Sequence, residues 1–190
     1  MSRPAAELNV LFVCTGNICR SPLAEQLFQT IADQNQLKTK ATSAGVYAQA
    51  GEPMHPNSQE AMRLINFTPK DHTSKQLTST LTSQADLIIT STAEHSNSTA
   101  HVDPAASKKT FTLKELARIT QYLQTNEDLP KVSTPTEKLK QAVQYRGYAP
   151  RTTQSEDIID PWGRSFETYI EVTNQTQENV EQIVNWLASK

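Results

Sequence analysis

A cysteine and an arginine stand six positions apart in the stretch CTGNICRSP, residues 14–22. The run LNVLFV before Cys14 indicates a short buried strand, and an amphipathic pattern typical of a helix begins at Pro22. A loop between a strand and a helix turns backbone N–H groups toward an anion, and the helix dipole adds positive charge. The Arg20 guanidinium can hold two oxygens of a tetrahedral oxyanion. The same positive field favours the thiolate of Cys14, which would then be a nucleophile facing a bound phosphate.

The residues around this pair suit such a loop. Gly16 and Asn17 tolerate a left-handed backbone. Ser21 is predicted as the N-cap of the helix and Pro22 as its first residue. The nucleotide-binding pattern G-x-x-x-x-G-K-[ST] is absent, so this is not a Walker loop. The alternative is that Cys14 is a small core side chain and Arg20 a surface charge, but the strand before them and the capped helix after them favour the anion-binding loop.

Hydrophobic patterning predicts the elements that position the loop. Strands alternate with amphipathic helices, which is typical of a parallel α/β sheet whose ligands bind at the carboxyl ends of the strands. We therefore expect a three-layer α/β fold with a central four-stranded parallel sheet flanked by helices. The expected strands are 8–13, 38–45, 85–90 and 108–113, and the expected helices are 22–35, 57–65, 113–123 and 165–190.

Length and composition narrow the class of protein. The 190 residues are expected to form one domain, 1–190, with a surface insertion at 125–155 that contains a short helix. A net charge of -2 and a pI of about 6.1 give no basic footprint for nucleic acid. No apolar run has the length of a membrane span or a secretory signal, so we expect a cytoplasmic monomer. Two cysteines, Cys14 and Cys19, are too few for a structural zinc site, and no metal or other cofactor is expected.

Several segments together resemble one protein family. CTGNICRSPLAE resembles the phosphate-binding loop of low-molecular-weight protein tyrosine phosphatases. TSAG at 42–45, GEPMHP at 51–56, HTSKQL at 72–77, ADLIIT at 85–90 and DPWG at 160–163 follow in the family's order. FTLKELARI and YRGYAPR resemble the longer bacterial members associated with exopolysaccharide or cell-wall control. The resemblance implies a phosphatase that hydrolyses phosphotyrosine in a protein, such as a bacterial tyrosine kinase, through a cysteinyl-phosphate intermediate.

The resemblance also implies a role for individual residues. Cys14 would be the nucleophile, Arg20 would hold the phosphate, and Asp160 would be the general acid and then the base. Ser21 would donate a hydrogen bond to the Cys14 sulfur. Ser43 and His72 would support a strained Asn17. The residues expected to contact phosphate or substrate are Thr15, Gly16, Asn17, Ile18, Cys19, Ser21, Tyr47 and Trp162.

An acid is needed because phenolate is a poor leaving group at neutral pH, and a positioned acid accelerates such a step by about 10²–10⁴-fold. Asp160 precedes Pro161, which holds it in an extended conformation. Asp103 also precedes a proline, but that dipeptide predicts only a turn. Asp157 is the fallback acid. Trp162 stands where the family usually has tyrosine, and an indole can still pack against a phenyl ring.

Alternatives to the tyrosine phosphatase remain. In the family, members that act on phosphoarginine tend to carry a threonine where this chain has Ile18, and isoleucine favours a flat aromatic substrate. An arsenate reductase of the same fold would need further cysteines beyond Cys19, and the chain has none. A non-catalytic phosphotyrosine-binding module would keep the loop but lose the nucleophile or the acid.

Two smaller expectations concern cysteine and histidine residues. Cys19 is expected either to pack behind the loop or to form a protective disulfide with Cys14 under peroxide. His55, His95 and His101 have no metal-ligand spacing and are expected at the surface.

Overall fold

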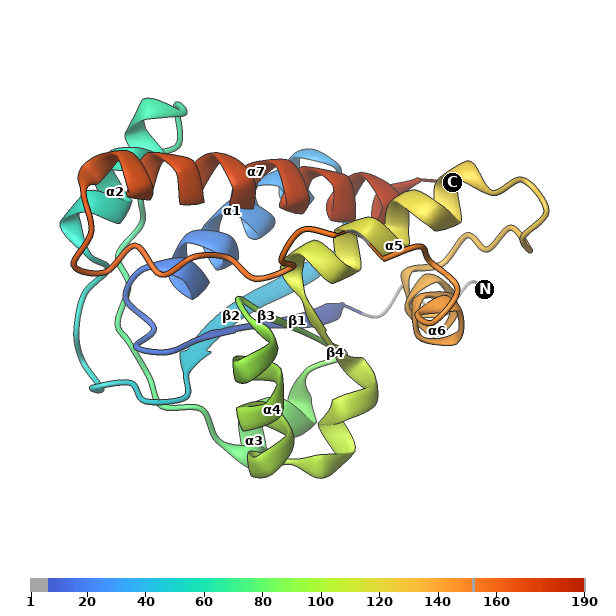
Figure 1. Ribbon diagram of the computed structural model, residues 1–190, viewed down its shortest axis with the longest axis horizontal. Helices are drawn as coiled ribbons and strands as arrows, with labels where there is room; N and C mark the ends of the chain where they lie inside the picture. Colours follow the sequence, from blue (N-terminus) through green and yellow to red (C-terminus); the bar gives the residue numbers. More distant parts are fainter. Residues whose placement is uncertain (1–6, 152, 190) are drawn as a thin grey trace.

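The computed structural model describes residues 7–151 and 153–189. Its described residues contain a four-stranded parallel sheet with the strand order β2-β1-β3-β4 (Figure 1). The predicted sheet is therefore confirmed, with each strand within two residues of its expected ends. The strands are β1 (Leu8–Cys14), β2 (Thr39–Gly45), β3 (Leu87–Thr90) and β4 (Thr110–Thr112).

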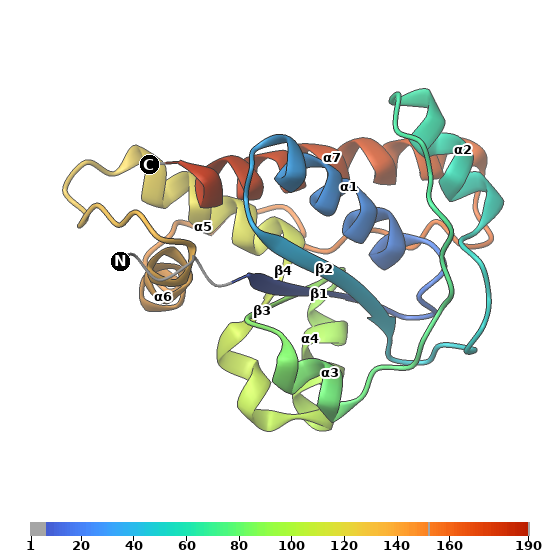
Figure 2. The ribbon, with the colours of Figure 1, turned by 180° about the vertical axis from the view of Figure 1, so that it is seen from behind.

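Helices cover both faces of the sheet, as Figures 1 and 2 show from opposite sides. One face carries the predicted helices α1 (Arg20–Gln34), α2 (Pro56–Leu64), α5 (Leu113–Thr125) and α7 (Phe166–Ala188). The other face carries α3 (Ser79–Gln84), α4 (Ala93–Val102) and the 3₁₀ helix η1 (Pro104–Lys109). Within the described ranges no helix is both long enough and apolar enough to cross a membrane.

Strand β1 is apolar throughout because both of its faces are buried. Phe12 packs into the larger core beneath α1 and α7, where its ring lies 5.5 Å from that of Phe28. Leu11 and Val13 point the other way, into the smaller core against Ile88 of β3. A strand buried on both faces reads as a continuous apolar run. This double burial fixes the end of β1, and with it the position of Cys14.

The helices α3, α4 and η1 were not predicted, and their sequences explain why. STLTSQ and AEHSNSTAHV are polar and lack an apolar stripe at helical spacing. These short elements instead begin at side-chain caps, in which Thr78, Thr92 and Asp103 accept hydrogen bonds from backbone N–H groups of the first turn.

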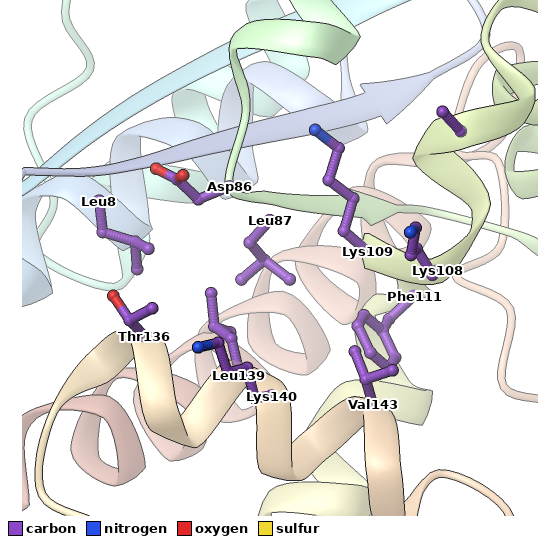
Figure 3. A pocket seen from close by; sticks show the side chains of 11 residues that line it. Leu8, Asp86, Leu87, Lys108, Lys109, Phe111, Thr136, Leu139, Lys140 and Val143 are labelled. Atoms are coloured by element: carbon purple, nitrogen blue, oxygen red, sulfur yellow. The ribbon is translucent and has the colours of Figure 1, made fainter.

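The segment 125–155 contains the predicted short helix, α6 (Pro135–Tyr145), which begins with a capping box between Thr134 and Glu137. Lys138 is buried, and its ammonium donates to the carbonyl oxygen of Trp186 at 2.7 Å, near the end of α7. A cavity of about 450 Å³ lies between α6 and the amino ends of β1 and β3, with Leu8, Leu87 and Phe111 in its wall (Figure 3). This end of the sheet is opposite to the end that carries Cys14.

Candidate active site

The loop between β1 and α1 curves around the backbone N–H groups of its own residues. Its carbonyl groups point outward: Thr15 O accepts from Tyr47 N at 2.9 Å, and Ile18 O accepts from His55 N at 2.8 Å. No described residue accepts a hydrogen bond from the N–H groups of residues 15–19. A run of unpaired N–H groups at the start of a helix is a binding site for an anion.

Asn17 maintains the bend of this loop. Its φ is 56°, in the left-handed region, which costs free energy for a residue with a Cβ. The Asn17 Nδ2 group donates to Ser43 Oγ at 2.8 Å and to Ser21 Oγ at 2.9 Å. His72 Nε2 donates to Asn17 O at 2.8 Å, and Lys75 N donates to Asn17 Oδ1 at 2.9 Å. The side chain and carbonyl are therefore held from several elements at once, which stabilises the strained backbone.

Glu25 is a member of this network that the sequence did not single out. Its carboxylate accepts a hydrogen bond from the Ser43 hydroxyl, so that hydroxyl is free to accept from Asn17. Glu25 lies one helical turn beyond Ser21, in the motif RSPLAE, and this spacing is the only sequence signal for it.

Gly45 allows β2 to pass directly against the loop. A Cβ at this position would lie 2.5 Å from Thr15 O and 2.9 Å from Asn17 N. Both neighbours are backbone atoms that cannot move without opening the loop. Any side chain at position 45 would therefore deform the loop.

Ser21 is not the N-cap that its position suggested. Helix α1 begins at Arg20 with Cys19 as the N-cap, and no side chain caps it. The Ser21 hydroxyl instead lies 3.0 Å from Cys14 Sγ. Because the loop curls back over the helix start, the serine faces the sulfur rather than the helix N–H groups. Its hydroxyl can stabilise a negative charge on Cys14.

Arg20 is buried, with 5% of its surface exposed, and its guanidinium crosses the floor of the site. Nη1 donates to Ile158 O at 3.3 Å, and Nη2 donates to Thr15 Oγ1 at 3.1 Å and to Asp160 Oδ2 at 2.7 Å. Nε is buried without a hydrogen-bond partner among the described residues. A buried, unpaired donor of a cation is costly unless an anion completes it.

A pocket of about 170 Å³ opens between the loop and the segment that carries Asp160. Trp162 forms an outer wall and is 66% exposed. Its backbone N–H donates to Asp160 Oδ1 at 3.2 Å, which fixes the carboxylate above Arg20. The residues lining the pocket are Cys14, Thr15, Gly16, Ile18, Cys19, Arg20, Asp160 and Trp162.

Cys19 lies behind the loop, in a small apolar cluster with Tyr169. Burial is the main cause that raises the pKa of the Cys19 thiol to about 11. Burial likewise raises the pKa of Tyr169 to about 12. Cys19 is therefore protonated and a poor nucleophile at neutral pH. Its predicted disulfide with Cys14 stays a prediction, and both thiols are free in this structure.

Two residues singled out by the sequence lie elsewhere. Tyr47 is 78% exposed and does not line the pocket, so its predicted contact with the substrate stays a prediction. Asp157 is turned away from the pocket lining, and its carboxylate accepts a hydrogen bond from Ala93 N at 2.8 Å, at the first residue of α4. It anchors the segment before Asp160 to α4.

The expectation that His95 lies at the surface is wrong. His95 is 5% exposed, and its Nε2 lies 2.9 Å from Thr15 Oγ1. The polar sequence of α4 gave no sign of this burial, because the contact joins residues 80 positions apart.

Comparison with known proteins agrees with this geometry. The sequence profile described as low molecular weight phosphotyrosine protein phosphatase matches residues 9–131. A protein-arginine-phosphatase of Bacillus subtilis is 30% identical over 96% of both chains. The low molecular weight protein-tyrosine-phosphatase YfkJ of Bacillus subtilis is 35% identical over 67% of this chain and 80% of its own.

Among solved structures, the YwlE arginine phosphatase, a mutant with a phosphorylated active-site serine, superposes with a TM-score of 0.72. It is 28% identical, and the match covers 95% of each chain. A parallel α/β sheet with a cysteine–arginine loop after its first strand defines a class of cysteine-dependent phosphatases. Within that class, the chain belongs to the low molecular weight phosphotyrosine protein phosphatase family.

Proposed function

We propose that the chain hydrolyses a phosphorylated protein side chain, with Cys14 as nucleophile and Asp160 as general acid. The observation that carries this proposal is a set of unpaired donors in one loop around Cys14. The N–H groups of residues 15–19 and Arg20 Nε lack acceptors on described residues, and Cys14 lies beneath them. A tetrahedral phosphate dianion supplies enough oxygens to satisfy them.

The first chemical step transfers the phosphoryl group to the enzyme. The Cys14 thiolate attacks phosphorus, the S–P bond forms, and the bond from phosphorus to the side chain of the substrate breaks. Asp160 gives its proton to the leaving atom. Arg20 and the loop N–H groups stabilise the negative charge on the equatorial oxygens. Such electrostatic stabilisation is usually the largest contribution to the rate of phosphoryl transfer in an enzyme. A relative of this chain solved with a phosphorylated active-site serine supports a phosphorylated intermediate here.

The second step releases phosphate. Asp160, now ionised, takes a proton from water as the water attacks phosphorus, and the S–P bond breaks. The Ser21 hydroxyl, 3.0 Å from the sulfur, stabilises the departing thiolate. The enzyme returns to its starting state without any further reactant.

Asp160 must leave Arg20 before it can act as an acid. In this structure its carboxylate accepts from Arg20 Nη2 at 2.7 Å and occupies a place on the guanidinium that a phosphate oxygen would need. A bound phosphate would take that position on Arg20.

The shape of the pocket favours phosphotyrosine as the substrate. Ile18 and Trp162 give the opening an apolar side, and both can pack against a phenyl ring. In the family that this chain resembles, an apolar residue at position 18 goes with tyrosine phosphatases and a threonine goes with phosphoarginine.

Phosphoarginine is the second candidate, and similarity favours it more strongly than phosphotyrosine. The B. subtilis relative that matches over 96% of both chains is named a protein-arginine-phosphatase, whereas the tyrosine phosphatase YfkJ matches over 67% of this chain. The two substrates differ in the group bonded to the phosphate, which is a flat ring in phosphotyrosine and a branched guanidinium in phosphoarginine. Ile18 lies at the pocket opening, where this group would enter.

Phosphate release from matched peptides carrying phosphotyrosine, phosphoarginine or phosphoserine tests both candidates. The geometry predicts a preference for phosphotyrosine, and Ile18→Thr should shift the ratio of the two kcat/KM values toward phosphoarginine. A preference of the unaltered protein for phosphoarginine would establish the second candidate. Cys14→Ser is the control, and turnover by that variant would contradict the mechanism.

A further inference from the structure

We infer that His95 is a positioning residue: it holds the Thr15 hydroxyl against Arg20, so that the β3–α4 turn orients the guanidinium that binds phosphate. The inference rests on the proposed function, because it concerns the same site. It adds His95 to that site, although His95 lies on α4 and no residue of α4 lines the pocket.

His95 joins the turn to the loop through two ring nitrogens. Its Nε2 lies 2.9 Å from Thr15 Oγ1, and its Nδ1 lies 2.8 Å from Thr92 Oγ1. Thr92 is the N-cap of α4 and also accepts from the backbone N–H of His95 at 3.3 Å. The ring is therefore held at one edge by Thr92, whose position is fixed by the helix start, and contacts Thr15 of the loop at the other.

The chain of contacts from Arg20 to Thr92 is compatible with a neutral His95 ring. Arg20 has no acceptor atoms, so its Nη2 donates to Thr15 Oγ1 at 3.1 Å. In one neutral tautomer the Thr15 hydroxyl donates to His95 Nε2, and His95 Nδ1–H donates to Thr92 Oγ1. In the other, Nε2–H donates to Thr15 Oγ1 and the Thr92 hydroxyl donates to Nδ1. Either neutral tautomer therefore keeps both contacts.

The charges around His95 favour the same neutral form. Burial is the main cause that lowers the pKa of His95 to about 4, and the nearby Arg20 cation lowers it further. Asp160 and Asp157, on the segment before α7, act in the opposite direction with smaller effect. A protonated ring would aim a second N–H at the Thr15 oxygen that already accepts from Arg20. Neutral pH therefore leaves the contact intact.

The contact matters most when phosphate is bound. Arg20 Nη2 is shared between Thr15 and Asp160 in this structure, and the proposed function removes Asp160 from it. Thr15 then remains as the acceptor on Nη2 and Ile158 O as the acceptor on Nη1, and together they set the plane of the guanidinium. Thr15 is only half-buried, so without His95 its hydroxyl could rotate away. Arg20 would lose part of the orientation that aims Nε at the anion.

Inorganic phosphate is the probe that tests this, because its binding does not require turnover. The dissociation constant for phosphate should rise about tenfold in His95→Ala, the effect expected from losing one hydrogen bond that supports a charged group. His95→Gln, whose amide can still accept from Thr15, should recover part of that loss. His101→Gln is the matched control on the same helix, because His101 is exposed, and its affinity should stay unchanged.

A double-mutant cycle separates positioning from a general role in packing. If His95 acts through Thr15, the effects of His95→Ala and Thr15→Val on phosphate affinity should not add, because either change breaks the same contact. Fully additive effects, or a lower Tm with unchanged phosphate affinity, would overturn the inference. Ring ¹⁵N shifts should show a neutral His95 at pH 7, and a protonated ring would also overturn it.

The experiments distinguish failure of the proposed function from failure of the inference on His95. If the unaltered protein binds phosphate but hydrolyses none of the phosphopeptides, the proposed function fails. The change in phosphate affinity of the His95 variants then still decides the inference by itself.

Discussion

Arg20 and Lys138 are both buried cations, yet their surroundings differ in kind. Lys138 is 3% exposed, and its ammonium donates to backbone carbonyls at the end of α7 and to the Ser189 hydroxyl. Arg20 is 5% exposed, and one of its partners is the Asp160 carboxylate, which a bound phosphate would displace. Its Nε has no hydrogen-bond partner among the described residues. The first cation is satisfied by the fold, whereas the second has a donor left for something else.

Lys138 and Arg20 also differ in the helix end that each cation faces. Lys138 belongs to α6, and its ammonium lies at the carboxyl end of α7, where the helix dipole is negative and favours a cation. Arg20 is the first residue of α1, where the dipole is positive, and the first turn of that helix contains no acidic residue. A cation at the positive end of a helix is unfavourable in itself. The arrangement becomes favourable when a dianion binds between the helix start and the guanidinium.

Arg20→Lys should give the largest effect. The shorter ammonium cannot hold two phosphate oxygens in fork geometry, so kcat/KM for an aryl phosphate should fall at least about 1,000-fold. Steady-state kinetics on phenyl phosphate measures it. Lys138→Met should leave the same kcat/KM unchanged, and a comparable loss in that variant would end the distinction between the two cations.

Asp160→Asn should have opposite effects on turnover and on phosphate binding. Hydrolysis of a substrate with a poor leaving group should slow by about 10²–10⁴-fold, because no proton reaches the leaving atom. Inorganic phosphate should bind more tightly, because it no longer displaces a carboxylate from Arg20. A series of aryl phosphates measures the first effect, and calorimetry measures the second. Equal slowing across all leaving groups would contradict the acid role.

His95 adds a buried group that titrates. Its pKa is about 4 in the folded protein, below its ordinary value, so between pH 6.5 and pH 4 the unfolded chain binds the extra proton. The free energy of unfolding should therefore fall as the pH falls through that window, by up to about 3 kcal/mol from this residue. Urea titrations at pH 7, 5.5 and 4.5 measure it. His95→Gln should show a shallower pH dependence, and an unchanged slope would count against a neutral buried ring.

Lys138→Met should give the smallest effect, and only on stability. Losing the donor for the α7 carbonyls should lower the free energy of unfolding by about 2 kcal/mol. Lys140→Met, at an exposed position of the same helix, is the control and should change it little. Denaturant titration at pH 7 compares them. If both variants lose the same stability, the buried cation has no special role in holding α6 to α7.

The elements predicted from the sequence are those whose signal is local. β1 is recognisable because both of its faces are apolar, and α5 and α7 because their buried residues recur at helical spacing. α4 was missed because it is polar and depends on the cap at Thr92. Ser21 was assigned to the helix cap because a serine before a proline is typical of one. Only the curl of the loop brings it to the sulfur instead.

The sequence by itself determined the four strands, the amphipathic helices and the presence of a cysteine and an arginine in one anion-binding loop. Those features depend on residue type and short spacing. The tertiary structure decided which donors are already satisfied and which remain free. Arg20 meets Asp160 from 140 residues away, and Thr15 meets His95 from 80 residues away. Such pairings depend on how the chain folds back on itself, which local spacing does not specify.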